Sequence, residues 1–357
     1  MSNNVRTKLE LSENGLSMPR KQSKRRKPSK KKDSVQKPSV VEVEHLKQEK
    51  SLNVVFQPNV GPQTEFLASN EREVLYGGSA GGGKSYAMLA DPLRYMGHPS
   101  FSGLLLRHTT EELRELIFKS KEIYPQIWKG IKWSERKMQW EAPSGARLWM
   151  SYLDRDDDVL RYQGLAFSWI GFDELTQWST PYAWNYMRSR LRSVAQDLPV
   201  YMRATTNPGG PGHQWVKKMF VDPAPYGSSF WATDIETGKT LMWPKGHSKE
   251  GEPLFKRRFI PATLFDNPYL AEDGRYEQML KALPPTQRKQ LLEGNWDVNE
   301  GAAFTEFSLD THVISPFEIP ISWERIKGID YGYASESACI WATLDPSDGT
   351  LIVYREL

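Results

Sequence analysis

The segment Gly78–Ser85, which reads GSAGGGKS, constrains the fold of this chain more than any other feature. It fits the pattern G-x-x-x-x-G-K-[ST], follows the apolar run Val74–Tyr76 and precedes residues that suit a helix. Glycines let a backbone wrap closely around phosphates, and the N-terminus of the next helix attracts the anion. The sequence therefore predicts a strand, a phosphate-binding loop and a helix. The expected phosphate-binding residues are Gly78, Ser79, Ala80, Gly81, Gly82, Gly83, Lys84 and Ser85.

Two acidic residues add the chemistry of hydrolysis. Asp173 and Glu174 follow the apolar run Trp169–Phe172, which predicts a buried strand. We expect Asp173 and the Ser85 hydroxyl to support Mg²⁺, Lys84 to reach the β/γ-phosphates, and Glu174 to act as the general base toward water. Alone, the two acids could simply cap a helix. Beside a phosphate loop they favour an ATP-hydrolysing enzyme.

Apolar runs and helical patterns alternate after about residue 51. Strands are predicted at residues 103–107, 169–172 and 200–204, and a helix at residues 111–124. Strands separated by helices predict an α/β fold with a mostly parallel sheet covered by helices on both faces. We assign residues 51–298 to this P-loop ATPase domain.

The two ends of the chain differ from this middle part. Residues 1–50 hold 14 Lys and Arg against 6 Asp and Glu, and predict a basic disordered tail. The tail could be an arm for DNA or a partner protein, or a solvated segment with no essential role. Residues 299–320 look like a linker, since apolar patterning weakens there and Pro316 and Pro320 interrupt it. Residues 321–357 predict a strand at 326–329 and a hairpin of strands at 337–344 and 350–354.

Cysteine content and hydropathy indicate the compartment. Cys339 is the one cysteine, so an internal disulfide is excluded and a reducing, intracellular setting is favoured. We expect Cys339 in the core of a strand. No apolar run reaches the ~18 residues that a membrane span requires, and no apolar stretch follows the basic N-terminus as in a secretory signal.

Four blocks of sequence occur in an order typical of one family. They are Pro62-Gln63, the phosphate loop, Gln163-Gly164 followed by Phe172–Leu175, and the TTNPGG block at residues 205–210. Together they resemble the ATPase domain of phage terminase large subunits, the motors that package viral DNA. The resemblance covers about residues 55–357. The phosphate loop is generic, whereas the TTNPGG block and a nuclease-like strand downstream are specific.

The resemblance implies an ASCE-type P-loop fold, ATP and Mg²⁺ as cofactors, and further site residues. Gln63 would contact adenine, since an amide both donates and accepts hydrogen bonds. A surface-loop glutamine remains the alternative. Thr205, Thr206 and Asn207 resemble the coupling motif that senses loss of the γ-phosphate, with Thr206 and Asn207 contacting the nucleotide. The Asn-Pro-Gly-Gly run also encodes a turn.

The resemblance also suggests an arginine finger. Arg107 follows a predicted buried strand, as an arginine does in terminases, and would stabilise charge in the transition state. Arg188, Arg190 and Arg192 compete for this role. A surface ion pair is the alternative for each.

Residues 328–332, which read GIDYG, resemble the first strand of an RNase H-like nuclease. Asp330 would join other carboxylates to hold Mg²⁺ in that fold, although it could also be an ordinary strand-end acid. The family's later acids should lie beyond residue 357. We therefore expect no nuclease activity from the chain as written, and an endonuclease that cuts concatemeric DNA in the full-length protein.

The predicted function is an ATP-driven motor that moves double-stranded DNA into a procapsid. The resemblance implies a portal protein, a terminase small subunit and a homo-oligomeric ring on the portal as partners, in the cytoplasm of the host cell. Another P-loop helicase or translocase is the nearest alternative. An ATP-gated DNA-binding scaffold with little turnover is the alternative of another class, which the intact Lys84, Ser85, Asp173 and Glu174 disfavour.

Overall fold

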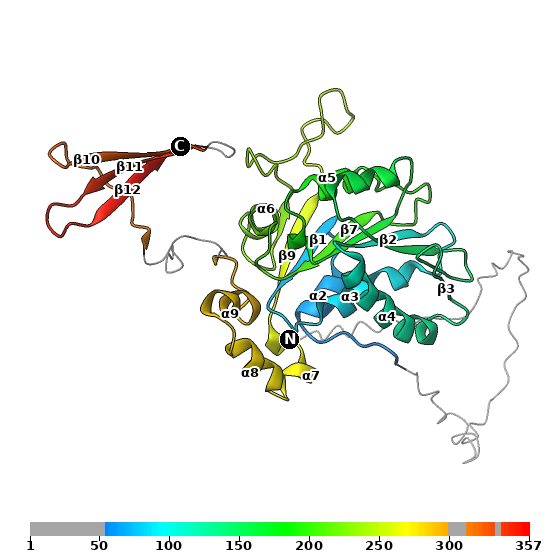
Figure 1. Ribbon diagram of the computed structural model, residues 1–357. Coiled ribbons are helices and arrows are strands. Elements are labelled where there is room, and N and C mark those ends of the chain that lie inside the picture. The colour runs from blue at the N-terminus through cyan, green and yellow to red at the C-terminus, as the bar shows by residue number, and fades with distance from the viewer. Residues whose placement is uncertain (1–53, 299–311, 333–336) are drawn as a thin grey trace, which may run out of the picture. The chain divides into compact units, whose positions relative to one another are not determined.

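The computed structural model describes residues 54–298, 312–332 and 337–357 (Figure 1). The predicted tail at residues 1–50 and most of the predicted linker, residues 299–311, lie outside the described residues. In the part of the chain that is described, no helix is long and apolar enough to cross a membrane.

A nine-stranded sheet forms the centre of the ATPase region. Its order is β3-β4-β5-β2-β6-β7-β1-β9-β8. The six strands from β5 to β9 in this order run parallel, and the antiparallel strands β3, β4 and β8 extend its edges. The predicted mostly parallel sheet is therefore confirmed. The bounds are β1 (Glu73–Gly78), β2 (Ser102–Arg107), β3 (Lys132–Ser134), β4 (Gln139–Glu141), β5 (Arg147–Tyr152), β6 (Trp169–Asp173), β7 (Tyr201–Thr206), β8 (Ser229–Trp231) and β9 (Lys256–Ala262).

Helices cover both faces of this sheet, as predicted. In β1, Val74 and Tyr76 pack into one buried apolar cluster and Leu75 into another, because successive side chains of a strand point to opposite faces. Each such fully buried side chain contributes about 1.5–3 kcal/mol. Figure 1 shows α2, α3 and α4 on one side and α5 and α6 on the other. Their bounds are α2 (Pro62–Ala68), α3 (Lys84–Ala90), α4 (Thr110–Ile127), α5 (Tyr182–Arg188) and α6 (His213–Val216).

Helix α4 shows how the sequence sets an element boundary. The Thr109 hydroxyl accepts a hydrogen bond from the Glu112 amide, and the Glu112 carboxylate accepts one from the Thr109 amide. This reciprocal cap satisfies two of the amides that a helix start leaves unpaired. The helix begins at Thr110, one residue before the predicted start.

Short helices complete the connections of the ATPase region. After β9, helices α7 to α9 return the chain to the phosphate loop. They are α7 (Pro268–Ala271), α8 (Arg275–Lys281) and α9 (Pro285–Leu291), and the remaining turns are the 3₁₀-helices Asp91–Tyr95, Asp156–Tyr162, Leu175–Gln177 and Leu264–Asp266 and the π-helix Lys217–Val221.

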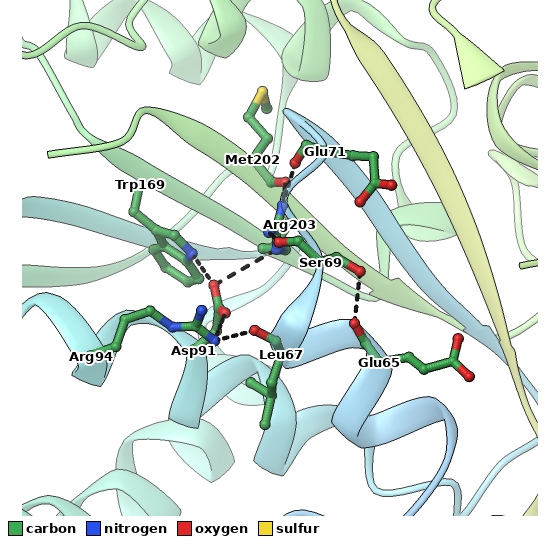
Figure 2. A network of polar contacts seen from close by, with 9 residues as sticks. All are labelled: Glu65, Leu67, Ser69, Glu71, Asp91, Arg94, Trp169, Met202 and Arg203. Atoms are coloured by element: carbon green, nitrogen blue, oxygen red, sulfur yellow. Dashed lines mark hydrogen bonds and ion pairs between the residues drawn. The ribbon is translucent and has the colours of Figure 1, made fainter. Parts of the chain in front are cut away.

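A buried polar network fixes α2 and the end of α3 against the sheet (Figure 2). Arg203 of β7 donates hydrogen bonds to the carbonyls of Ser69, at 2.6 Å, and Glu71, at 3.0 Å, just beyond α2. Its Nε lies 3.8 Å from Asp91, which follows α3 and accepts a 2.8 Å hydrogen bond from the Trp169 indole. Because these groups are buried, breaking the network would leave an uncompensated charge. The network therefore holds together the elements that carry the site.

A separate three-stranded antiparallel sheet has the order β10-β11-β12. Its strands are β10 (Arg325–Asp330), β11 (Ala338–Leu344) and β12 (Leu351–Glu356), so the predicted strand and hairpin are confirmed. Cys339 lies in β11, as expected, but it is only half-buried. The predicted core position is wrong, because apolar side chains such as Ile329 and Ile340 remain largely exposed in this small sheet.

Candidate active site

The phosphate loop joins β1 to α3, and its glycines are required by geometry. Gly78 has a φ of +136°, and a Cβ there would lie 2.1 Å from the carbonyl oxygen of Ala262 in β9. Gly83 has a φ of +77°, and a Cβ there would lie 2.7 Å from the side-chain amide nitrogen of Gln63. A side chain at either position would meet both strain and a clash. The loop therefore connects a strand to a helix at the position that the sequence pattern predicted.

Lys84, the first residue of α3, is buried inside the loop. Its ammonium donates a 2.5 Å hydrogen bond to the carbonyl oxygen of Ser79. Burial lowers the pKa of Lys84, and the nearby carboxylates of Glu174 and Asp173 oppose that shift. A desolvated cation held in this way interacts strongly with a phosphate. Ser85 is half-buried in the same first turn, where helix amides have no partner within the helix.

Gln63 is buried against the phosphate loop, so the surface-loop alternative is wrong. It lies in α2, its Nε2 donates to the Gly83 carbonyl at 2.9 Å, and its Oε1 accepts from the Asn59 amide at 2.6 Å. One N–H and one lone pair of the amide remain for a ligand. Gln63 therefore contacts the loop directly and can still present an amide edge.

The acidic pair lies at the carboxyl end of β6. Asp173 is fully buried, and one of its oxygens accepts a hydrogen bond from the Thr205 hydroxyl. Its Oδ2 lies 3.2 Å from the Arg107 Nε at the end of β2. The two atoms form a close ion pair without hydrogen-bond geometry, and the Arg107 Nη1 also has no hydrogen-bond partner. Arg107 is 12% exposed, so its ion pair is buried and the surface alternative is wrong.

Glu174 adopts a strained conformation beside Asp173. Its φ of +60° and ψ of +58° are left-handed, which is uncommon for a residue other than glycine and is often found at functional sites. Its Oε2 accepts a hydrogen bond from the Asn207 amide at 3.2 Å. Burial and the charge of Asp173 raise the pKa of Glu174, against the opposing effects of Lys84 and Arg107. A carboxylate with a raised pKa is a stronger base.

Strand β7 lies between the strands of the loop and of the acidic pair. Thr206 is in register with Gly77 of β1, and Thr205 is in register with Asp173 of β6. The Asn207 side-chain oxygen is buried and has no hydrogen-bond partner. The carboxyl ends of parallel strands are where ligands bind in open α/β sheets. The structure therefore brings the loop, the acidic pair, Arg107 and the predicted coupling residues together.

The oxygen atoms at this place fit Mg²⁺. The ion prefers carboxylate and hydroxyl oxygens and keeps several waters. Asp173 offers a buried carboxylate oxygen without a hydrogen-bond partner, and Ser85 offers a hydroxyl in the first turn after the loop. The residues present are those that such an ion requires.

Four other predicted residues lie elsewhere. Arg188 pairs with Glu73 at the amino end of β1, opposite to the phosphate loop. Arg190 packs over the Tyr186 ring, and Arg192 donates to the Gly164 carbonyl at 3.1 Å. Asp330 is exposed at the end of β10. Within the described ranges, no three or more His, Cys, Asp and Glu side chains are grouped so that they could hold a metal ion, at Asp330 or elsewhere.

A protein-family model matches most of the ATPase region. The model for the N-terminal part of T4likevirus-type terminase large subunits matches residues 75–311. This chain belongs to the terminase large subunit family. No curated protein sequence matches it.

Solved structures of packaging proteins are similar to this terminase. The large terminase of a thermophilic bacteriophage in complex with ADP shares 17% identity, with 84% of this chain and 68% of that chain covered and a TM-score of 0.49. The ATPase domain of the Thermus phage P74-26 large terminase shares 13%, covering 68% and 94%, with a TM-score of 0.44. The bacteriophage Phi-29 genome packaging motor shares 13%, covering 84% and 80%, with a TM-score of 0.41.

Three residues of this terminase contact the site although the sequence did not predict a role for them. Asn267 donates a 2.7 Å hydrogen bond to the Gly81 carbonyl of the phosphate loop. His213 accepts one of 2.8 Å from the Gly209 amide, and Gln290 lies against Gly209. The position of His213 just after the TTNPGG block was the available signal. Asn267 and Gln290 carry no signal in the sequence, because only the fold brings them to the site.

Proposed function

We propose that this chain hydrolyses ATP with Mg²⁺ and uses the energy to move double-stranded DNA into a procapsid. One observation carries the proposal: the buried cation of Lys84, in the loop after β1, and the half-buried base candidate Glu174, directly after β6, lie at the same end of the sheet on either side of β7. Hydrolysis needs both, a cation for the phosphates and a base for water. A nucleotide-gated scaffold would not need Glu174 in this strained position.

The proposed nucleotide contacts follow from the positions of the side chains. Residues 78–85 cradle the phosphates, with Lys84 on the β/γ-phosphates. Asp173 and Ser85 hold Mg²⁺, which when bound neutralises phosphate charge. The free edge of the Gln63 amide pairs with adenine. Thr206 and Asn207 contact the γ-phosphate or the attacking water.

The proposed chemical step is direct attack of water on the γ-phosphorus. Glu174 takes one proton of the water, and the unpaired side-chain oxygen of Asn207 accepts the second water hydrogen and orients the nucleophile. The bond between the γ-phosphorus and the bridging oxygen breaks, which yields ADP and phosphate. Arg107 stabilises negative charge that develops on the transferred group.

The proposed setting follows from membership of the terminase family. The partners would be a portal protein, a terminase small subunit and further copies of this chain in a ring, in the host cytoplasm. Residues 51–298 would be the motor domain, residues 1–50 a basic tail and residues 299–320 a linker. Residues 321–357 would begin an RNase H-like nuclease, with Asp330 as a metal ligand for cutting concatemeric DNA.

Nucleotide binding and turnover by the purified chain test the proposal. We expect slow release of phosphate from ATP that requires Mg²⁺ and rises with double-stranded DNA and portal protein. Lys84→Ala should abolish it, while Lys249→Ala, in an exposed loop, serves as the control. If no Mg²⁺-dependent binding of adenine nucleotides is found with or without these partners, the proposal is wrong.

A further inference from the structure

His213 joins two segments of the chain that both touch the site. The Gly209 amide donates to its Nδ1 at 2.8 Å, so the ring proton is on Nε2, which lies 3.0 Å from the Trp296 carbonyl oxygen and donates to it. Burial lowers the pKa of His213, in keeping with a neutral ring. The ring also stacks on the Trp296 indole, with centroids 5.2 Å apart. One imidazole thus bridges the turn at residues 207–210 and the chain near residue 296.

The second of these segments, residues 290–298, is called the exit segment here, because the chain runs from it to residue 299. A second side chain of this segment, that of Gln290, packs against the same turn. A Cβ on Gly209 would lie 3.1–3.3 Å from the Gln290 amide, and Gln290 Nε2 donates to the Val298 carbonyl at 3.0 Å. Lys217, one turn after His213, pairs with Asp297 at 3.0 Å.

The exit segment also contacts the phosphate loop. The Ala80 amide donates to the Leu291 carbonyl at 2.7 Å. A Cβ on Gly294 would lie 2.7 Å from the Ser79 nitrogen, and the Trp296 ring lies 3.3 Å from a Cβ position at Gly77. The exit segment is therefore held between the loop that binds phosphate and the turn whose Asn207 amide binds Glu174.

The turn has space in which to move. A pocket of about 310 Å³ lies between it and α9, and it extends from Glu174 to the exposed Gln287. Packed interiors resist displacement, whereas a pocket lets one wall shift. The His213 ring hydrogen-bonds both the turn and the exit segment, and the Gln290 side chain, which lines this pocket, lies against Gly209 of the turn.

We propose that His213 is the positioning residue that transmits the state of the γ-phosphate site to the exit segment. When the γ-phosphate is cleaved, the contacts of Glu174 and Asn207 change and the turn shifts. The hydrogen bonds of His213 then carry that shift to Trp296 and the rest of the exit segment. This inference rests on the proposed ATPase function.

Two substitutions separate the two bonds of the imidazole. In His213→Asn, the side-chain oxygen stands near the former Nδ1 and can accept from Gly209, but nothing reaches Trp296. In His213→Gln, the amide stands near the former Nε2 and can donate to Trp296, but the bond to Gly209 is lost. Asp297→Asn is the control, since it removes only an ion pair at the surface of the same segment.

Hydrogen exchange of the full chain, measured with Mg²⁺ and either ADP or ATPγS, tests the proposal. In the wild type, protection of residues 294–298 should differ between the two nucleotides. Both His213 variants should bind ATPγS within about threefold of the wild type and lose at least half of that difference, while Asp297→Asn keeps it. A wholly structural role of His213 would not remove a nucleotide-dependent difference selectively.

The possible results separate this inference from the function on which it rests. If the wild type binds and hydrolyses ATP but residues 294–298 respond equally to ADP and ATPγS, the inference is wrong. It is also wrong if folded His213 variants keep the full difference. The wild-type comparison of ADP with ATPγS needs no variant, so the inference can be tested even if a His213 variant folds poorly. If no nucleotide binds at all, the ATPase proposal itself fails.

Discussion

The Nε of Arg107 lies 3.2 Å from the Oδ2 of Asp173, in a pair that is closed off from solvent. Lys84 and Glu174 complete a site with two cations and two carboxylates. Such a site is close to neutral, so a triphosphate brings charge that the protein alone does not balance. Mg²⁺ beside Asp173 would provide that balance and would compete with Arg107 for the same oxygen.

Arg107→Ala should harm both activity and stability. It leaves Asp173 buried without its ion-pair partner, which costs about 3–5 kcal/mol of unfolding free energy when no compensation occurs. If Arg107 also stabilises the transition state, kcat falls by about 10³–10⁵-fold. Chemical denaturation and phosphate release measure the two effects. Arg136→Ala, at an exposed arginine in a turn, should change neither, and an unaltered kcat in Arg107→Ala would remove Arg107 from the mechanism.

Glu174→Gln should separate binding from turnover. The amide keeps the shape of the side chain and can still accept from the Asn207 amide, but it cannot take a proton from water. We expect ATP affinity near that of the wild type and a kcat lower by about 10²–10⁴-fold. Calorimetry with ATPγS and a phosphate-release assay measure the two quantities. Glu122→Gln on the exposed side of α4 is the matched control, and wild-type turnover in Glu174→Gln would refute the assignment of the base.

The pH dependence of activity and of stability should have opposite signs at Glu174. Its pKa is raised above the ordinary 4.5 by burial and by Asp173, against Lys84 and Arg107. The base must be ionised, so kcat/KM should fall as pH drops through the raised pKa. The folded state binds this proton more tightly than the unfolded state does, so the contribution of Glu174 to stability is present below pH 4.5 and is lost as pH rises through the raised value.

Glu174→Gln, which cannot ionise at this position, is the reference for the pH dependence of both activity and stability. Melting curves of wild type and variant between about pH 4 and pH 8 should converge toward the acid side, where Glu174 is neutral. The apparent pKa of the acid limb of the kcat/KM profile should be higher than the pKa of an ordinary carboxyl group. A limb at the ordinary value would mean that Glu174 is more hydrated than the structure indicates.

Short-range signals account for the parts that the sequence predicted. The strands β1, β2 and β6 each contain a short apolar run, β7 begins with the apolar pair Tyr201-Met202, and the phosphate loop has a fixed pattern of glycines. Each signal lies within a few residues, so no knowledge of the fold is needed. The position of β7 between β1 and β6, by contrast, depends on strand order. The resemblance to terminases suggested roles for Thr206 and Asn207 without this geometry.

Strand β9 shows why other parts were missed. It reads KRRFIPA, with three basic residues and a proline, and such a composition does not indicate a buried central strand. Arg257 is nevertheless buried, because Glu73 on the neighbouring strand β1 pairs with it at 2.7 Å. The compensating charge is far away in sequence and becomes visible only in the sheet. The contacts of Arg107 with Asp173 and of His213 with Trp296 were hidden for the same reason.

Asp330→Ala should leave ATP hydrolysis unchanged. Asp330 ends β10 in the small sheet, whereas the proposed ATPase residues lie on and around the nine-stranded sheet. It is exposed, so its replacement should shift stability by no more than about 0.5 kcal/mol. Phosphate release with and without DNA should agree with the wild type within about twofold. A loss of turnover that matches that of Glu174→Gln would contradict the division into two separate sites.

Gly78→Ala should disable the phosphate loop through backbone geometry alone. The new Cβ would lie 2.1 Å from the Ala262 carbonyl oxygen, at a φ of +136° that alanine rarely adopts. Gly238 offers a matched control, since its φ is also positive, at +67°, but a Cβ there meets nothing within 4 Å. Both substitutions carry conformational strain of about 1–3 kcal/mol, and only Gly78→Ala adds displacement of β1 from β9. We therefore expect a lower melting temperature in both variants and loss of Mg²⁺-dependent ATP binding in Gly78→Ala alone. Normal binding by Gly78→Ala would show that β1 and β9 can separate without disturbing the loop.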